Sequence, residues 1–225
     1  MRIGIMGGTF DPIHYGHLNS AEEIAEIFKI DQILFIPAFI QPHKRGEKTA
    51  DAYHRLMMTL LATLSNPRFT VSTIEIEKRG YSYTIDTMKK LSKTLRRNTH
   101  FYFIAGIDAF KEISTWKDAD RLLKSCDFIV STRPGYRIDD LFKILSETVS
   151  KKYRGIRFKI EKKSSSLKSS RLSVIGSRTF IHTVETTPFD ISSTEVRNRI
   201  RKGMTIKYLL PELVEDYIYK NELYV

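Results

Sequence analysis

The sequence contains one cysteine and no long apolar run. Cys126 alone among 225 residues excludes a thiolate metal site and fits a reducing cytoplasm. No stretch approaches the roughly 18 consecutive apolar residues of a membrane-spanning helix. The chain opens on a strand-like pattern, without a charged and apolar leader. We therefore expect a cytoplasmic protein that makes no membrane contact.

Its glycines do not fit the common nucleotide-binding loops. A dinucleotide fingerprint needs the spacing G-x-G-x-x-G, whereas this chain offers Gly4, Gly7 and Gly8 with no further glycine in register. No Gly-Lys-Ser or Gly-Lys-Thr follows them, which excludes a Walker loop. A metal site on the nearby histidines lacks a third ligand at the usual spacing, so we predict no metal ligands in the protein.

The sequence does contain a strand, a glycine loop and a helix near its N-terminus. Residues 3–6 form an apolar run typical of a buried strand, and residues 18–30 carry apolar side chains at helical spacing. Between them, Gly7 and Gly8 let a ligand approach the backbone closely, and the helix start presents unpaired N–H groups. The pattern predicts a phosphate-binding site.

Two imidazoles accompany this loop. His14 and His17 are three residues apart with Gly16 between them, so both rings can face one anion if the helix begins there. Neither lies in an acid or base motif, which suits a reaction that depends on charge stabilisation more than on proton removal. A structural pair of histidines is the simpler alternative.

The formal net charge of +11 comes mostly from one stretch. Residues 151–178 hold ten Lys or Arg and a single acid, Glu161. Such basicity can indicate nucleic-acid binding, but a serine-rich charged stretch is more typical of a solvated, mobile insertion. We interpret residues 158–178 as a basic, serine-rich insertion and do not expect nucleic acid as a main partner.

The remaining chain alternates between two periodicities. Predicted strands lie at residues 32–38, 69–77, 101–105, 128–131 and 180–184, and predicted helices at 51–64, 85–95 and 139–153. This alternation predicts an α/β fold with a doubly wound, Rossmann-like parallel sheet. We expect one domain over residues 1–225, with a small helical C-terminal part at 190–225 that includes two short helices at 208–219.

Polar residues follow several predicted strands, where an open parallel sheet forms its ligand crevice. Asp108, just past Gly106, is placed for a ribose hydroxyl, or else as a helix cap. Arg133 leaves the next strand and can stack on a purine. Trp116 beside Lys117 offers an aromatic face and a cation to a flat ring, although packing alone also explains it.

Further anion sites are predicted at helix starts. Ser192 and Glu195 match a capping box, and Arg197 lies about one turn inside that helix. Hydroxyls, free N–H groups and a guanidinium there would hold a di- or triphosphate tail, while an ordinary capped helix is the alternative. Thr84 stands at another predicted helix start with the same potential.

In this order, the motifs resemble the H-x-G-H nucleotidyltransferase superfamily, and within it the bacterial nicotinate mononucleotide adenylyltransferases. The resemblance is carried by GGTFDPIHYGH at 7–17, PHK at 42–44, SYT at 82–84, G-x-D at 106–108, Trp116, RPG at 133–135 and ISST-x-x-R at 191–197. It implies that the AMP moiety of ATP is transferred to nicotinate mononucleotide, giving nicotinate adenine dinucleotide and pyrophosphate. The implied cofactor is Mg²⁺ carried by ATP, without dedicated protein ligands.

The resemblance also implies roles for single residues. His14 and His17 would be the catalytic pair that holds the ATP phosphates. The implied ATP-binding residues are Gly7, Gly8, Thr9, Phe10, Gly106, Asp108, Arg133, Ser192, Ser193 and Arg197. The implied contacts of the mononucleotide are His43, Lys44, Thr84, Trp116 and Lys117.

Two alternatives remain open. Pantetheine-phosphate adenylyltransferases are similar at the first and last motifs, but that family is shorter and lacks the SYT and tryptophan pair. A protein that binds nucleotides or RNA without catalysis should have lost a phosphate-handling residue, whereas both histidines and Arg197 are present. The basic stretch matches no family motif, and the sequence leaves open whether the protein is a homo-oligomer.

Overall fold

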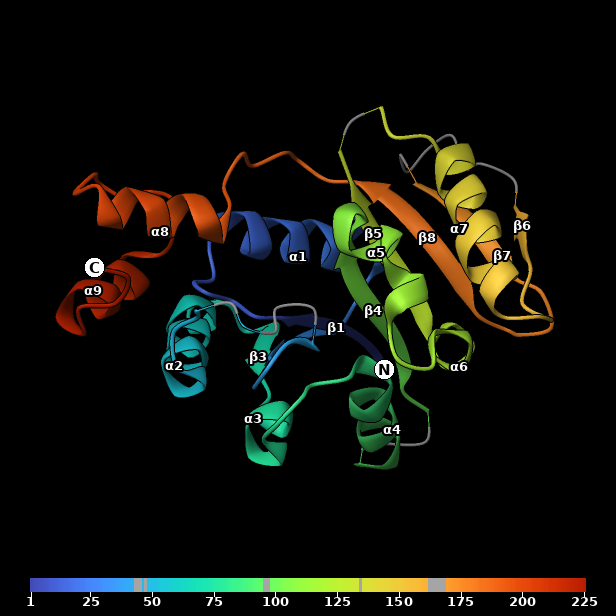
Figure 1. Cartoon of the computed structure of the whole chain (residues 1–225), viewed down its shortest axis with the longest axis horizontal. Coiled ribbons are helices and arrows are strands. Elements are labelled where there is room, and N and C mark those ends of the chain that lie inside the picture. The colour runs from blue at the N-terminus through green and yellow to red at the C-terminus, as the bar shows by residue number, and fades with distance from the viewer. Residues whose placement is uncertain (43–45, 47, 95–97, 134, 162–168) are drawn as a thin grey trace.

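One sheet runs through the whole molecule (Figure 1). The computed structural model describes residues 1–42, 46, 48–94, 98–133, 135–161 and 169–225. Within them, the strands are β1 (Arg2–Gly8), β2 (Gln32–Pro37), β3 (Phe69–Val71), β4 (His100–Gly106), β5 (Asp127–Thr132), β6 (Phe158–Ile160), β7 (Ser169–Val174) and β8 (Phe180–Glu185). Their order is β3-β2-β1-β4-β5-β8-β7-β6.

The sheet is doubly wound, as predicted. The strands from β3 to β8 in this order pair in parallel, and β7 and β6 extend the sheet in antiparallel fashion. From the neighbours β1 and β4 the chain continues in opposite directions, to β2 and β3 on one side and to β5 and β8 on the other. This reversal is the position at which open α/β sheets bind their ligands.

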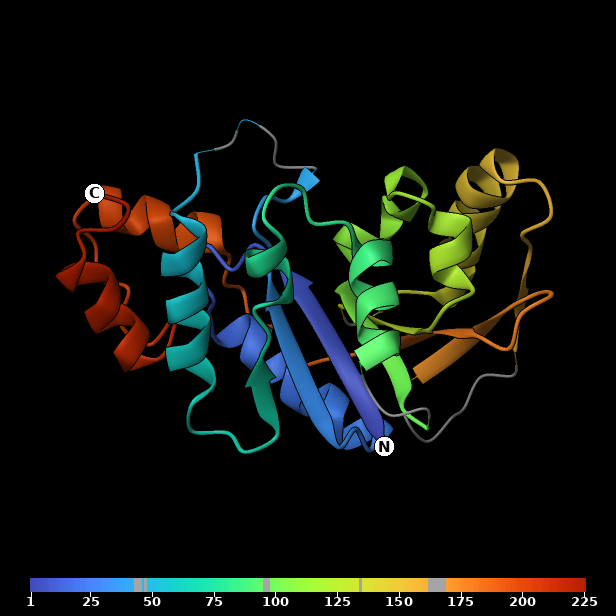
Figure 2. The same ribbon diagram turned by 90° about the horizontal axis from the view of Figure 1, so that it is seen from below.

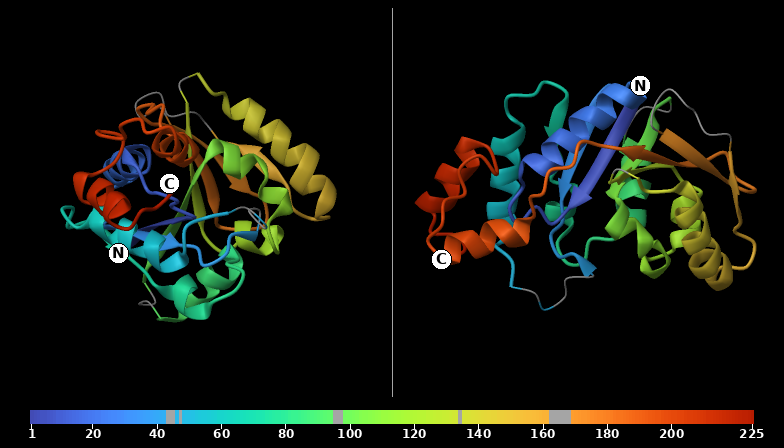
Figure 3. Two further views of the ribbon diagram at one scale, coloured as in Figure 1. Left: turned by 60° about the vertical axis from the view of Figure 1, so that its left-hand side comes forward. Right: turned by 90° about the horizontal axis from the view of Figure 1, so that it is seen from above.

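Helices cover both faces of the sheet (Figure 1). They are α1 (Tyr15–Phe28), α2 (Ala52–Thr63), α3 (Ile74–Lys78), α4 (Thr84–Thr94), α5 (Ile107–Lys111), α6 (Ala119–Leu123), α7 (Ile138–Lys152), α8 (Ser193–Arg201) and α9 (Glu212–Lys220), with a short 3-10 helix, η2, at Ile113–Thr115. Figures 2 and 3 place α8 and α9 beside α2 at one end of the molecule, and α7 with β6 and β7 at the other. No helix in the described ranges is long and apolar enough to cross a membrane.

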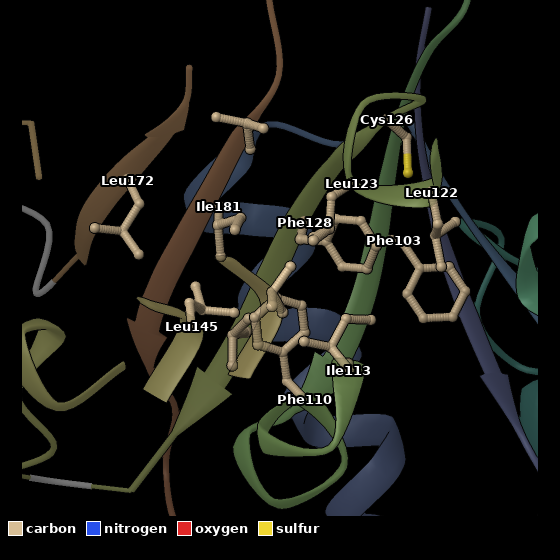
Figure 4. Packing of buried hydrophobic residues seen from close by; sticks show 14 of the residues in the cluster. Phe103, Phe110, Ile113, Leu122, Leu123, Cys126, Phe128, Leu145, Leu172 and Ile181 are labelled. Carbon is tan, nitrogen blue, oxygen red and sulfur yellow. The ribbon is translucent and has the colours of Figure 1, made fainter. Parts of the chain in front are cut away.

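Consecutive strand residues enter two different cores, because successive side chains of a strand point to opposite faces. Phe103 and Ala105 of β4 pack with the helices α4 to α7, whereas Ile104 packs on the face of α1 and α2. Figure 4 shows the first core, in which the Phe128 ring packs against both Phe103 and Phe110 of α5. The near-continuous apolar runs of the central strands follow from this burial on both faces.

One predicted strand is partly wrong. Residues 69–77 alternate like a strand, but only Phe69–Val71 joins the sheet, and α3 follows. The Ser72 hydroxyl accepts a hydrogen bond from the Ile74 N–H (3.3 Å), which turns the chain. Glu75 and Glu77 then lie in the first turn of α3, where negative charge favours a helix.

The interpretation of residues 158–178 as a solvated loop is also partly wrong. Residues 158–160 and 169–174 form β6 and β7, and residues 162–168 lie outside the described ranges. Leu172 and Val174 are buried, while Arg171, just before them, is exposed and Ser173, between them, is half-buried. Charged and serine side chains occupy the outward positions of these strands. They give the stretch a composition typical of disorder, so the strands were not predicted from the sequence.

The C-terminal part is helical in α8 and α9. Within residues 208–219, however, α9 is the one helix, instead of the two short helices expected from the sequence. Pro211 caps α9, and Tyr208 has a positive φ of 67°, so the chain turns before the helix begins.

Candidate active site

The glycine loop leads from β1 into α1, and the helix begins at Tyr15, earlier than its apolar periodicity suggests. His14 is the N-cap residue, with extended backbone (φ −148°, ψ 171°). Its N–H donates to Nδ1 of His17 (3.3 Å), and the two ring centroids are 3.8 Å apart. Both rings line one cleft, as the sequence predicts for a shared anion site.

His14 is buried, and one of its ring nitrogens is unpaired within the described ranges. The side chain is almost fully buried, and desolvation lowers its pKa from 6.5 to about 4. Its Nδ1 has no hydrogen-bond partner among the described residues. Gly16 permits this arrangement, because a Cβ there would lie 3.0 Å from Nδ1 of His14. The glycine in H-x-G-H is therefore explained by the close approach of the His14 ring.

Residues 8–12 are held by donors from distant parts of the chain. Four of their carbonyl oxygens accept hydrogen bonds: Gly8 from the Ala38 N–H (2.8 Å), Thr9 from Arg55 (2.7 Å), Asp11 from Arg197 (2.7 Å) and Pro12 from the Ser193 hydroxyl (2.8 Å). Because these oxygens are engaged within the protein, they contribute less repulsion to an anion in the cleft. Two of the donors are guanidinium groups, which add positive charge behind the loop.

Phe10 fixes the other side of the histidine pair. It has a positive φ of 50°, which is uncommon for a bulky residue, and its ring is buried. The ring meets His17 edge-on, with centroids 5.3 Å apart at 81°. Backbone strain of this kind is retained where the surrounding structure needs it, often at functional sites.

The cleft lies at the carboxyl ends of β1, β4 and β5, where the strand order reverses. Its walls bring together most of the predicted ATP-binding residues: Gly7, Gly8, Phe10, Gly106, Asp108, Arg133, Ser192 and Ser193. Asp108 is in the first turn of α5, and its side chain is 79% exposed. It pairs with Lys111 (4.0 Å) while remaining accessible to a ligand, and Gly106 takes the N-cap position.

The start of α8 lines the far wall of this cleft. Ser192 is the N-cap residue, and its side chain accepts a hydrogen bond from the Glu195 N–H (3.1 Å), as the capping box predicts. Ser192, Ser193 and Thr194 all face the cleft. Helix N-termini attract anions through their N–H groups and dipole, so this wall and the His14 wall can hold phosphates between them.

A second, more apolar pocket adjoins the cleft. Thr84, Trp116 and Lys117, predicted to contact the mononucleotide, all line it. Trp116 packs edge-on against Phe103, with ring centroids 5.8 Å apart at 84°. The remaining wall residues are Ile5, Gly7, Gly8, Ile36, Ala38, Gln41, Pro42, Glu75, Ser82, Tyr83, Thr87 and Thr115. We call this the ring pocket.

Lys117 lines the ring pocket as predicted, but its cation is already paired with a carboxylate of the protein. Its Nζ lies 3.0 Å from a carboxylate oxygen of Asp86 and 4.7 Å from the centroid of the Tyr83 ring. Lys78 also approaches Asp86, at 3.4 Å. The cation therefore lies at the pocket wall with a partner of its own, and a ligand carboxylate has to compete with Asp86 for it.

The cleft and the ring pocket share one wall. Gly7, Gly8, Gln41, Phe103 and Trp116 line both. The side-chain oxygen of Gln41 accepts a hydrogen bond from the Thr9 hydroxyl, which ties this wall to the glycine loop. Two ligands bound in the two pockets would therefore meet above the glycines at the end of β1.

Two of the predicted contact residues, Thr9 and Arg197, do not line these pockets. Thr9 is buried beneath the loop and bonds to Gln41, and Arg197 is engaged with Asp11. His43 and Lys44 lie outside the described residues. Arg197 also lies 3.6 Å from a carboxylate oxygen of Asp11, so its first role in this structure is to hold the loop.

Sequence inspection missed Arg55. It is the largest fully buried side chain, and its guanidinium donates to the carbonyl oxygens of Thr9, Ala38, Phe39 and Ala50. The one available signal was an arginine on the apolar side of a predicted helix, close to the buried Met58 and Thr59. Its partners are distant in sequence and could not be identified without the fold.

The fold and the paired pockets define an α/β nucleotide-binding protein with room for a second, aromatic ligand. The chain belongs to the cytidylyltransferase-like family, whose model matches residues 5–199. This agrees with the resemblance to nucleotidyltransferases carried by the sequence motifs.

Curated relatives and solved structures narrow the comparison. The chain is 46% identical over 224 residues to a probable nicotinate-nucleotide adenylyltransferase from Thermoanaerobacter sp. (strain X514), covering 100% of this chain and 94% of the relative. A protein of the same name from Dictyoglomus thermophilum is 40% identical over 225 residues, with 100% of both chains covered. The Plasmodium falciparum nicotinic acid mononucleotide adenylyltransferase complexed with NaAD shares the fold, with a TM-score of 0.69, 22% identity and coverage of 99% and 97%.

Proposed function

We propose that this protein transfers the AMP moiety of ATP to nicotinate mononucleotide, forming nicotinate adenine dinucleotide and releasing pyrophosphate. The observation that carries the proposal is the shared wall of the two pockets above Gly7 and Gly8. A cleft with two anion-binding walls suits ATP, and an aromatic pocket beside it suits the pyridine ring. The names of the curated relatives support the same reaction.

The reaction requires positioning more than proton transfer. A phosphate oxygen of the mononucleotide attacks the α-phosphorus of ATP, and the bond to the bridging oxygen of pyrophosphate breaks. The attacking oxygen is already anionic near neutral pH, so no general base is needed. The obstacle is repulsion between two anions and the charge that develops on the leaving group, which fixed donors and cations offset.

His14 and His17 suit this task at the α-phosphate. Their rings meet the cleft from the helix start, where N–H groups and the dipole also favour negative charge. His14 is held neutral by burial in the free protein, so a bound phosphate would favour its protonation. Ser192 and Ser193 would then hold the β- and γ-phosphates that leave as pyrophosphate.

Mg²⁺ would arrive with ATP. This ion keeps several waters and is usually held by substrate phosphates with at most one or two carboxylates. The groups at this end of the cleft are imidazoles, hydroxyls and N–H groups, with the carboxylate of Asp190 beside Ser192 in the cleft wall. This set fits a metal bound to phosphates better than a metal enclosed by protein ligands. When bound, Mg²⁺ neutralises charge on the phosphates.

The remaining assignments follow the pocket walls. Asp108 and Arg133 would meet the adenosine part of ATP, and Thr84 and Trp116 the nicotinate ring. His43 and Lys44 remain predicted contacts of the mononucleotide on the sequence pattern alone.

The ring pocket should prefer an acid over an amide. A nicotinate carboxylate can accept N–H and O–H bonds at the start of α4, near Thr84, whereas a carboxamide turns an NH₂ donor toward those donors. One lost charged bond and one unpaired donor cost about 2 to 4 kcal/mol, or roughly 30-fold to 1,000-fold in kcat/KM.

Pyrophosphate release from ATP and Mg²⁺ tests the assignment, with nicotinate mononucleotide, its amide and phosphopantetheine compared side by side. We expect rapid release with the acid alone. Comparable kcat/KM for the amide would contradict the role of Thr84. Release with phosphopantetheine would contradict the nicotinate assignment, and release with none of the three would contradict the enzyme assignment.

A further inference from the structure

A buried carboxyl group lines the ring pocket without a role in the reaction above. Glu75 comes from the short helix α3, and 8% of its surface is exposed. It lies in the same pocket wall as Thr84 and Trp116. An acidic side chain is rarely buried unless it is paired, so its presence beside the site for an anionic ring needs an explanation.

Glu75 is hydrogen-bonded to two hydroxyl groups that flank Thr84. The Thr87 hydroxyl donates to Oε1 of Glu75 at 2.5 Å, and the Ser82 side chain also hydrogen-bonds to the carboxyl group. Both hydroxyl residues line the ring pocket. Thr87 belongs to the first turn of α4, and Ser82 lies just before that helix. The carboxyl group therefore joins the two sides of the turn that carries Thr84.

Ser82 connects the same turn to the end of β2. Its hydroxyl oxygen accepts a hydrogen bond from the Phe39 N–H (3.0 Å), and its own N–H donates to the Ile40 carbonyl (2.9 Å). Ile40 and Tyr81 also form a parallel bridge. Glu75 thus fixes α4 against the strand whose continuation, at Ala38 and Gln41, lines the pocket.

This arrangement has a cost in free energy. Burial raises the pKa of Glu75, while the hydrogen bonds from Thr87 and Ser82 and the charge of Lys78 lower it. Two apolar side chains of similar volume would avoid that cost. Perturbed carboxyl groups in a cleft wall are more common at functional sites than elsewhere, which favours a functional reason for keeping this one.

We propose that Glu75 is a positioning residue for the mononucleotide: through Ser82 and Thr87 it holds Thr84 and the first turn of α4 in the orientation that receives the ring. This deepens the proposed function and rests on it. The role is specific to one substrate, because none of these residues lines the ATP cleft. Weakening the contact should therefore affect binding of the mononucleotide and leave ATP binding unchanged.

Intrinsic fluorescence gives a direct readout. Trp116 is the only tryptophan in the chain and lies in the ring pocket, so its emission should respond to a bound pyridine ring. We would titrate nicotinate mononucleotide into the wild type and the variant Glu75→Gln, and measure KM for ATP in parallel. The expected result is an increase of about tenfold in the Kd of the mononucleotide, with KM for ATP changed by less than about twofold.

Glu77→Gln is the matched control. Glu77 lies in the same helix, but it is exposed and hydrogen-bonds to Thr73 away from the pocket. This control should bind the mononucleotide like the wild type. An equal rise in Kd for both glutamine variants would overturn the proposal, since it would point to α3 stability. A parallel rise in KM for ATP in Glu75→Gln would overturn it as well.

A double-mutant cycle tests the route of the effect. If Glu75 acts through Thr87, the change Glu75→Gln should have a smaller effect on Kd in a Thr87→Val background than in the wild type. Additive effects would overturn the proposed connection. Should Glu75→Gln fail to fold, the variants Thr87→Val and Ser82→Ala alone must each raise the Kd, and a wild-type Kd in both would overturn the proposal.

Failure of the proposed function would look different. Wild-type protein that shows no fluorescence response to nicotinate mononucleotide, and no pyrophosphate release with it, would contradict the nicotinate assignment and this inference together. A wild type that responds and turns over, with an unchanged Kd in Glu75→Gln, would contradict this inference alone.

Discussion

The burial of His14 makes the stability of the fold depend on pH. Its pKa is about 4 in the folded protein and 6.5 as an ordinary side chain. Between these values the unfolded chain binds more protons than the folded one, so stability rises with pH through this window and falls as the pH is lowered. A group that is protonated only at this cost in the free protein is suited to take up charge when an anion arrives.

The pH dependence should be measurable by urea denaturation. From about pH 7.5 to about pH 5, the wild type should lose roughly 2 kcal/mol through His14. The variant His14→Gln, which has no group titrating there, should lose less over the same interval. Histidines that do not contact residue 14 contribute equally to both proteins and cancel in the comparison, whereas His17 contacts the changed side chain. Identical pH profiles would show that His14 is not held neutral by burial.

Gly16 should separate activity from stability. The change Gly16→Ala suits a helix, but the new Cβ would lie 3.0 Å from His14 Nδ1 and displace a ring that also contacts His17. We expect kcat to fall by about tenfold or more while the melting temperature stays within a few degrees. Steady-state kinetics and thermal unfolding check this. A fully active variant would mean that the His14 position is not critical.

At the scale of single elements, α8 acts as a clamp on the glycine loop. Its first turn lines the cleft, and Arg197, one turn further, donates to the Asp11 carbonyl. The Ser193 hydroxyl holds the Pro12 carbonyl in the same way. The motif ISST-x-x-R therefore has two parts, since its cap lines the cleft and its arginine orders the glycine loop opposite.

Removing the arginine should damage both binding and turnover. Arg197→Ala loses a charged hydrogen bond to the loop, so kcat/KM for ATP should fall by about 10-fold to 100-fold, with contributions from KM and kcat. Arg201→Ala is the matched control, because Arg201 lies on the same helix, is exposed and hydrogen-bonds through its side chain to Asn198 instead of the loop. Wild-type kinetics in Arg197→Ala would refute the clamp.

Elements whose ends are marked by capping residues could be predicted from the sequence, whereas features that depend on contacts formed only in the fold could not. The capping residues of α8 identify its start, whereas α1 begins at Tyr15, before the apolar periodicity that starts at Leu18. By contrast, α3 depends on a hydrogen bond from the Ile74 N–H to Ser72, which strand-like alternation conceals. Arg55 is buried because four carbonyl oxygens surround it in the fold, and none of its contacts has a sequence signature.

For the whole molecule, the sheet extends beyond the part that carries the site. The hairpin of β6 and β7 adds two antiparallel strands after β8 and contributes Leu172 and Val174 to the core under α7. The apolar runs of the sequence predict the parallel strands of the sheet. The two antiparallel edge strands were not predicted, because their composition is basic and rich in serine. We therefore expect the hairpin to contribute to the stability of the fold.

Truncating a buried side chain of the hairpin tests this role. Leu172→Ala should lower the free energy of unfolding by about 2 to 4 kcal/mol, because the side chain is fully buried in the core. Kinetic constants below the unfolding transition should change by less than about twofold. Arg171→Ala, on the outward face of the same strand, serves as the control. A loss below about 0.5 kcal/mol would restore the interpretation as a solvated loop.

The donors that hold the glycine loop are far from it along the chain. Arg197 reaches Asp11 across 186 positions, and Ser193 reaches Pro12 across 181. Contacts of such separation form slowly, because closing a long loop costs conformational entropy before the contact stabilises it. We therefore expect the loop to be completed late in folding. ATP would then bind only chains that have finished folding, and at concentrations above its Kd it would protect them from unfolding and proteolysis.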